Sequence, residues 1–235
     1  KKNIYSEFLP DEYFKYSKKT LTDQFVEMLK TKTQVEIIDL RNIIFDAKKV
    51  HPILYHKMDN HWNDIGAYYA YQTIVRYLSR TFPVGNPHEF EEYQLDTLTY
   101  YGGSIARMLG VQDSLIDYRL KIKPKFDTGV KRLPQKYQSP ERFPYPNSYE
   151  RRFASQNDSL PRLLMINDSF GEYYYNFLPE HFSYSLFLFD IWEFKLHAKK
   201  VLEEKPDVFI LSVFEGFIPK IIDNLHREEN QIPNP

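Results

Sequence analysis

The final third of the chain alternates apolar runs with helical patterns, and this alternation restricts the fold more than any other feature. The apolar runs cover residues 163–166, 182–189 and 208–213. Each run precedes a segment whose apolar residues recur at helical spacing, at about 170–178, 194–203 and 217–225. Nearly continuous apolar strands separated by helices are typical of a parallel sheet that is covered on both faces. We therefore predict an α/β fold built on a mainly parallel sheet.

The first eighty residues show a similar mixture of patterns. They predict strands at 3–8, 35–40 and 53–55, and a helix from about Tyr13 to Lys30. A second helix should begin after Asn63, because asparagine is favoured at the N-cap position. The apolar face of that helix recurs at offsets of three and four and comprises Ala67, Ala70, Tyr71, Ile74, Tyr77 and Leu78.

The segment from 82 to 161 has weaker patterns and frequent turn residues. It predicts a short helix at 104–109 and strands near 115–122 and 149–154. We interpret it as an irregular insertion or a substrate-facing subregion, within a single domain that covers residues 1–235. The basic residues between Lys121 and Lys136 are interrupted by prolines and a glycine, which favours an exposed loop over a polyanion-binding site.

Composition excludes several classes of function. The 31 basic residues balance 32 acidic ones, so no overall positive charge attracts nucleic acid, and we expect no nucleic-acid partner. The absence of cysteine excludes disulfides, thiolate catalysis and zinc–thiolate sites. No apolar run is long enough to span a bilayer. The abrupt start at Lys1 suggests a fragment, whose missing N-terminal part could have held a targeting segment or a membrane anchor.

Two short polar motifs, more than a hundred residues apart, carry the chemistry. Asp59 and His61 lie on a predicted loop directly before the second helix, and Ser169 follows the apolar run at 163–166. In open parallel sheets, ligands bind beyond the carboxyl ends of the strands, where unpaired backbone N–H groups can stabilise an oxyanion. Ser169 could act there as a nucleophile, with His61 as its base and Asp59 orienting the imidazole.

Simpler interpretations of these residues stay open. Ser169 could be a helix N-cap, a role that Asp168 would fill equally well. His61 could be structural. Carboxylates and histidines near it, namely Asp59, Asp64, His51 and His56, raise the possibility of zinc, but the HExxH spacing is absent and we expect no metal.

Residues 59–67 read Asp-Asn-His-Trp-Asn-Asp-Ile-Gly-Ala. This stretch resembles the "D-x-H-W-(T/S/N)-x-x-G-A" block of the SGNH hydrolase-like polysaccharide O-acetyltransferases of the alginate AlgJ/AlgX type. Four further stretches resemble family segments in the family's order: 4–10, 103–110, 168–182 and 204–208. The resemblance therefore covers nearly the whole chain.

This resemblance implies a three-layer SGNH hydrolase-like fold in circularly permuted order, because the Asp/His block precedes the serine block. It implies Ser169 as nucleophile, His61 as base and Asp59 as the partner of His61. The implied activity is O-acetylation of an extracellular or cell-wall polysaccharide, without a diffusible cofactor. It further implies an extracytoplasmic location and an acetyl donor that is supplied by a membrane-bound acyltransferase.

Three residues carry additional predictions. Asn167 stands where the family commonly has glycine, and its amide could add an oxyanion donor. Glu215, after the last strand, is a candidate substrate-binding residue, although Gly216 stands where the family often has arginine. Trp62 could stack on a sugar ring or belong to the core. An acetyl esterase with the same triad and a non-catalytic glycan-binding module are the alternative functions.

Overall fold

The computed structural model describes residues 4–10, 19–190 and 196–229. The chain forms two compact units, each built from several segments. In the described chain, the first unit contains 4–10, 38–128 and 176–178, and the second contains the remaining residues. The single-domain organisation expected from the sequence stays a prediction. No helix within the described ranges has both the length and the apolar character needed to cross a membrane.

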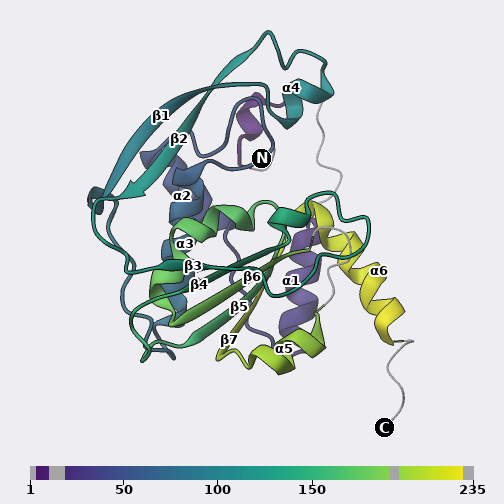
Figure 1. Ribbon diagram of the computed structural model, residues 1–235. Helices are drawn as coiled ribbons and strands as arrows, with labels where there is room; N and C mark the ends of the chain where they lie inside the picture. The colour runs from purple at the N-terminus through teal and green to yellow at the C-terminus, as the bar shows by residue number, and fades with distance from the viewer. Residues whose placement is uncertain (1–3, 11–18, 191–195, 230–235) are drawn as a thin grey trace. The chain divides into compact units, whose positions relative to one another are not determined.

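The second unit is built on a five-stranded sheet with the strand order β3-β4-β6-β5-β7 (Figure 1). Its strands are β3 (Lys131–Leu133), β4 (Glu150–Ala154), β5 (Arg162–Asn167), β6 (Tyr184–Phe189) and β7 (Val208–Ser212). Strand β5 pairs in parallel with β6 on one side and with β7 on the other. Strands β4 and β3 extend the β6 edge in antiparallel orientation. The predicted α/β fold is confirmed, and the three apolar runs form its parallel strands.

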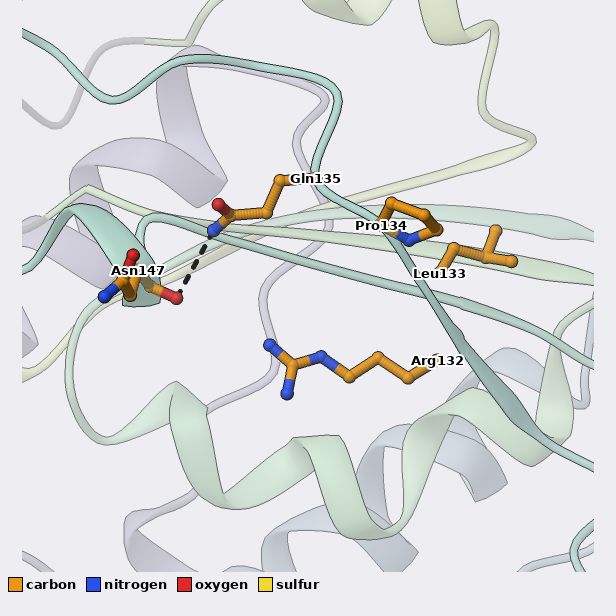
Figure 2. A pocket seen from close by; sticks show the side chains of 5 residues that line it. All are labelled: Arg132, Leu133, Pro134, Gln135 and Asn147. Atoms are coloured by element: carbon orange, nitrogen blue, oxygen red, sulfur yellow. Dashed lines mark hydrogen bonds between the residues drawn. The ribbon is translucent and has the colours of Figure 1, made fainter.

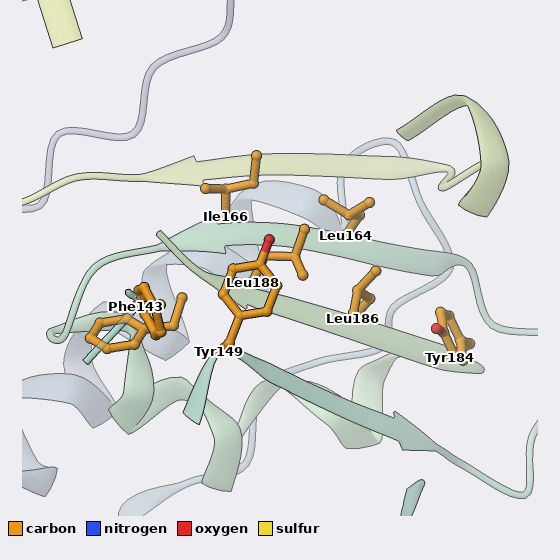
Figure 3. Close-up of a cluster of buried hydrophobic side chains, with 8 residues drawn as sticks. Phe143, Tyr149, Leu164, Ile166, Tyr184, Leu186 and Leu188 are labelled. Atoms are coloured by element: carbon orange, nitrogen blue, oxygen red, sulfur yellow. The ribbon is translucent and has the colours of Figure 1, made fainter. Parts of the chain in front are cut away.

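A buried apolar cluster covers one face of this sheet (Figure 3). Leu164 pairs with Leu186 and Ile166 with Leu188, so matched residues of β5 and β6 lie side by side on that face. Phe143 and Tyr149 pack against them. Burying each such aliphatic side chain contributes about 1.5–3 kcal/mol to the free energy of folding. Strands buried on both faces therefore carry apolar residues at almost every position.

The helices of the second unit are α1 (Leu21–Lys32), α5 (Ala198–Glu204) and α6 (Ile218–Glu229). Short 3-10 turns occur at η3 (Pro146–Ser148), η4 (Gly171–Asn176), η5 (Leu178–His181) and η6 (Glu215–Phe217). Helix α1 begins after Thr20, whose hydroxyl accepts the N–H of Asp23 in a capping box. The segment predicted as a helix at 170–178 instead consists of the 3-10 turn η4 and the beginning of η5.

The first unit combines helices with a long β-hairpin. Its helices are α2 (Arg41–Val50), α3 (Asp64–Leu78) and α4 (Ser104–Met108), with 3-10 turns η1 (Ser6–Phe8) and η2 (Phe90–Glu92). The hairpin pairs β1 (Tyr93–Tyr101) with β2 (Ile116–Pro124). The predicted cap of α3 is confirmed, because the Asn63 side chain accepts the N–H groups of Ile65 and Gly66. The predicted apolar face is buried except at Tyr77, which is half-buried.

Several expected elements near the N-terminus are wrong. The described part of 3–8 contains the turn η1, and 35–40 forms no strand. Residues 53–55 reduce to a single bridge between Tyr55 and Trp62. Helix α2 has no counterpart in the sequence analysis. Helices α1 and α5 begin later than predicted, and the expected residues 13–18 and 194–195 lie outside the described chain.

The segment 82–161 is more regular than the sequence analysis predicts. It holds four strands, of which β1 and β2 belong to the first unit and β3 and β4 to the second. The expected basic loop is wrong for Lys121 and Lys123, on β2, and for Lys131 and Arg132, on β3. Most side chains of β1 and β3 are exposed, so these two strands lack the buried alternation that would mark a strand in the sequence.

Replacing Asn63 with alanine should lower the free energy of unfolding by about 1–2 kcal/mol, because the cap of α3 would be lost. The Asn63 side chain also donates 2.8 Å to the Ile53 carbonyl and is 1% exposed, so that acceptor would lose its partner. Urea denaturation followed by circular dichroism measures the change. The exposed Asn176 provides the matched control, and an equal effect of Asn176→Ala would contradict the assignment.

Candidate active site

In the first unit, Asp59 and His61 form a direct hydrogen-bonded pair. The imidazole Nδ1 of His61 lies 2.5 Å from Asp59 Oδ1, and the His61 backbone N–H donates 3.0 Å to the same oxygen. An ionised carboxylate only accepts hydrogen bonds, so Nδ1 carries the proton. Nε2 is then the nitrogen of the neutral ring that can take up a proton. The sequence-predicted base and its acid are thus brought together in the required tautomer.

The pKa of Asp59 reflects two opposing effects. Burial raises it, but the hydrogen bonds from His61 and from the backbone N–H of Ser104 outweigh burial and hold the pKa well below its usual range. Asp59 is therefore ionised at neutral pH. A fixed negative charge beside the ring favours the imidazolium that a general base becomes when it accepts a proton.

The start of helix α4 holds the Asp59 loop in place. The backbone N–H of Ser104 donates 3.0 Å to Asp59 Oδ2, whereas His61 Nδ1 bonds to the other oxygen, Oδ1. The Ser104 hydroxyl donates 2.6 Å to Asn60 Oδ1 and accepts the Asn60 N–H at 3.1 Å. Both carboxylate oxygens of Asp59 thus have donors, which fixes the orientation of the group.

The same loop needs a glycine at position 103. Gly103 has φ of 119°, and a Cβ atom there would collide with the carbonyl group of Met58. That carbonyl accepts the N–H groups of Ile105 and Ala106, at 3.1 and 3.3 Å. The sequence analysis predicted a short helix here and matched residues 103–110 to the family, but it missed Ser104 as a positioning residue. The Gly-Gly-Ser sequence before a helical pattern was the available signal.

In the second unit, Ser169 follows the carboxyl end of β5 in a turn that Asp168 braces. The Asp168 side chain is fully buried. Its Oδ1 accepts the N–H of Phe170 at 2.9 Å, and its Oδ2 accepts the N–H of Phe214 in the loop after β7. Asp168 therefore fills the capping role that the sequence left open between Asp168 and Ser169. Ser169 itself is half-buried.

Asn167 serves the turn and is a poor oxyanion donor. Its Nδ2 donates 2.8 Å to the Asp168 carbonyl and 3.4 Å to the Tyr175 hydroxyl, so both amide hydrogens have acceptors within the protein. The backbone lies so close that a Cβ at Gly171 would collide with the Asn167 side chain. The backbone N–H groups of Phe170 and Gly171 also donate within the turn, to Asp168.

The other two predicted binding residues occupy different settings. Glu215 lies in η6, directly after the loop that Asp168 holds, and its Oε2 accepts the Thr22 hydroxyl at 3.4 Å. Trp62 is 6% exposed, and its backbone forms the bridge with Tyr55. This burial favours the core interpretation of Trp62 over stacking on a sugar.

The residues considered as metal ligands take structural roles. Asp64 is fully buried and accepts the N–H of Ile122 at 3.0 Å and the Lys121 ammonium at 3.2 Å. Burial, together with the charge of nearby Arg119, lowers the pKa of His56 to about 4, so its ring is neutral at pH 7. Among the described residues, no three histidine, aspartate or glutamate side chains gather where they could hold a metal ion.

Comparisons with known proteins agree on one family and one fold. The family model "SGNH hydrolase-like domain, acetyltransferase AlgX" matches residues 1–180, a range that includes Asp59, His61 and Ser169. No curated protein matches the sequence.

Three solved structures are similar. A DHHW family protein from Eubacterium siraeum has a TM-score of 0.65 and 16% identity, covering 90% of this chain and 74% of that one. PatB1 of Bacillus cereus has a TM-score of 0.64 and 14% identity, covering 92% and 80%. The O-acetyltransferase domain of Pseudomonas putida AlgJ has a TM-score of 0.60 and 16% identity, covering 93% and 73%. At these identities, the similarity shows a shared fold.

Replacing Ser104 with proline should raise the pKa of Asp59 by about one unit, since it removes one N–H donor from the ionised carboxylate. Ser104 is the first residue of α4, where proline is compatible with the helix. Ser104→Ala is the matched control, because it removes the hydroxyl and keeps the N–H. NMR titration of the Asp59 carboxyl carbon measures both. Equal shifts in the two variants would show that the N–H does not hold the carboxylate.

The contribution of Asp59 to stability should depend on pH. Because the folded-state pKa is lowered, the stabilisation is complete above the unfolded value of about 3.9 and is lost as the pH falls through the folded pKa. The parent should therefore exceed Asp59→Asn in unfolding free energy at pH 6, with a smaller difference at pH 3. Denaturation at both pH values tests this, and a constant difference would contradict it.

Proposed function

Because this chain belongs to the SGNH hydrolase-like domain family of the acetyltransferase AlgX, we propose that it moves acetyl groups onto hydroxyls of an extracellular or cell-wall polysaccharide. Family membership makes the chain an O-acetyltransferase. The polysaccharide acceptor, the triad and the source of the acetyl group form the proposal. The observation that carries it is the 2.5 Å contact between His61 and an ionised Asp59, which prepares the imidazole as a base.

The first half of the proposed reaction forms an acyl-enzyme. The Ser169 hydroxyl oxygen attacks the acetyl carbonyl carbon of the donor, while His61 Nε2 takes the hydroxyl proton. Asp59 stabilises the resulting imidazolium. The bond between the acetyl group and the donor breaks, and His61 returns the proton to the leaving group. The acetyl group is then esterified to Ser169.

The second half transfers the acetyl group to the acceptor. A sugar hydroxyl attacks the acyl carbon, and His61 Nε2 takes its proton. The ester bond to Ser169 breaks, and the serine oxygen recovers the proton from His61. Water in place of the sugar would release acetate, so the esterase alternative differs only in the acceptor.

The proposal extends to partners and location. The acetyl donor comes from a membrane-bound acyltransferase, and the chain works outside the cytoplasm, free or anchored. No diffusible cofactor takes part, since the acetyl group is carried by Ser169 itself. The family model, whose description names the acetyltransferase AlgX, and the fold shared with the AlgJ domain support these expectations.

Incubation with p-nitrophenyl acetate should add one acetyl group to Ser169, detected by intact mass and peptide mapping. Ser169→Ala should abolish the adduct, and His61→Ala should slow its formation by about 10²–10⁴-fold because the general base is lost. Ser114→Ala, at an exposed serine, is the matched control. Adding candidate polysaccharides then separates transfer to sugar from release of acetate.

An adduct on another serine, or one that His61→Ala leaves unaffected, would refute the proposed triad. A folded parent that forms no adduct but binds glycan, equally well as Ser169→Ala, would support the glycan-binding module instead.

A further inference from the structure

The hairpin of the first unit is a separate two-stranded sheet, so β1 and β2 each have one edge without a neighbouring strand (Figure 1). The Gly102 N–H bonds across the hairpin to the Leu115 carbonyl, one step beyond the last β1–β2 pair. At the other end, Lys125 bonds to Glu92 in the same way. Hydrogen-bonded and non-bonded pairs alternate in an antiparallel ladder, so the even-numbered residues of β1 bond to β2. The exposed odd-numbered residues direct their N–H and C=O groups away from β2, and they are Leu95, Thr97, Thr99 and Tyr101.

The outer edge of β2 is closed by side chains. The Ile122 N–H, which faces away from β1, donates 3.0 Å to the buried carboxylate of Asp64. The Tyr118 N–H, on the same edge, donates 2.8 Å to Asp117 Oδ1. Cations and a terminal proline also discourage pairing with a further strand, and β2 carries Arg119, Lys121, Lys123 and Pro124.

The edges of the larger sheet in the second unit are protected in similar ways. Strand β3 has three residues, of which Lys131 and Arg132 are charged, and Pro134 follows it. Figure 2 shows the Gln135 amide, directly after that proline, bonded to the Asn147 carbonyl at 3.3 Å. At the opposite edge, one of the five residues of β7 is exposed. Short strands, charge, proline and burial are devices that keep strand edges from pairing with other chains.

The outer edge of β1 lacks these devices. Of its nine residues only Asp96 is charged, and that carboxylate is paired with Lys123 of the same hairpin at 2.6 Å. Residues 97–101 read Thr-Leu-Thr-Tyr-Tyr, so four of the five are types that favour strands. Within the described ranges, no hydrogen bond reaches the outward N–H groups of this strand beyond Tyr93. A long, exposed edge of this kind is a site where another strand pairs.

The sequence of β1 is complementary to itself in antiparallel orientation. A two-fold axis beside Leu98 sets Leu95 opposite Tyr101 of a second copy. The same axis sets Thr97 opposite Thr99. Both pairs consist of outward residues, so each exchanges two N–H···O=C bonds. Thr–Thr pairs across strands are favourable, and Leu95 gains an aromatic neighbour.

The side chains on the other face of β1 are equally compatible with this register. Leu98, which is 49% exposed, lies opposite Leu98 of the second copy. This is a non-hydrogen-bonded position, where opposite side chains come closest. Asp96 lies opposite Tyr100, so no like charges meet. A partner with a different sequence would have to match this pattern, whereas a second copy matches it by symmetry.

We propose that the outer edge of β1 binds β1 of a second copy of this chain, so that two hairpins join into a four-stranded antiparallel sheet. An isolated two-stranded hairpin is marginally stable, and additional strands stabilise it. A strand of nine residues is about 30 Å long, so the contact is smaller than a standard interface of about 1,600 Å². The dimer is therefore reversible and forms at high protein concentration. It does not depend on the proposed acetyl transfer.

Sedimentation equilibrium of the full chain, from about 10 μM to 1 mM, should show a monomer–dimer equilibrium. Leu98→Lys should raise its dissociation constant by at least about 10-fold, because an apolar contact becomes two like charges opposite each other. Leu109→Lys is the matched control, since it makes the same change at a leucine that is 69% exposed and lies outside the hairpin strands. It should change the constant by less than about 2-fold.

Thr97→Pro tests the backbone pairing separately. It removes an outward N–H that the hairpin itself does not use, and proline is tolerated at such edge positions. The dimer should be lost. Thr97→Ala keeps the N–H and should dimerise within about 3-fold of the parent.

Amide hydrogen exchange locates the surface. The N–H groups of Leu95, Thr97 and Thr99 should exchange more slowly as the concentration rises, whereas that of Leu98, bonded to β2, should not change. A chain that stays monomeric throughout, or a dimer that Leu98→Lys leaves intact, would overturn the proposal. Slow exchange of the outward amides in the monomer would also overturn it, because the edge would then be covered by the chain itself.

Discussion

Strand β5 pairs on both sides with parallel strands, and this central place in the sheet determines where Ser169 lies. All of its residues after Arg162 are buried. The chain must therefore leave the sheet through a turn whose backbone N–H groups find acceptors within the protein, as those of Phe170 and Gly171 do. Asn167 and Asp168, both fully buried, supply that turn, and Asp168 also holds the loop after β7. Ser169 is the first residue beyond this braced segment that reaches partial exposure.

The Asp59 loop also needs hydrogen-bond partners for a buried polar group, and here they come from other residues. A buried carboxylate is costly unless it is hydrogen-bonded, and here the donors come from His61 and from the first turn of α4. The close approach of that turn requires glycine at position 103. The arrangement that satisfies the charge of Asp59 is also the one that sets the tautomer of His61, so stability and chemistry depend on the same contacts.

Local signals predicted much of this architecture. The apolar runs of β5, β6 and β7 and the cap of α3 at Asn63 were all visible in the sequence, because burial and capping leave a mark on neighbouring residues. The segment after Ser169 was predicted as a helix and forms the 3-10 turns η4 and η5 instead. Gly171 lies so close to the Asn167 side chain that a Cβ atom there would collide with it. The apolar stretch at 35–40 resembles a strand but finds no pairing partner, so it stays irregular.

The sequence by itself determined the class of fold, the chemical types at the candidate site and the order of the two motifs, since each depends on residues close together in the chain. Only the tertiary structure decided which groups hold the candidate site residues in place. The bond from Ser104 to Asp59 joins residues 45 positions apart, and that from Phe214 to Asp168 joins residues 46 apart. The face from which Arg132 projects likewise depends on the pairing of β3 with β4. A strand of three exposed residues carries no local pattern, so its partner alone defines its register.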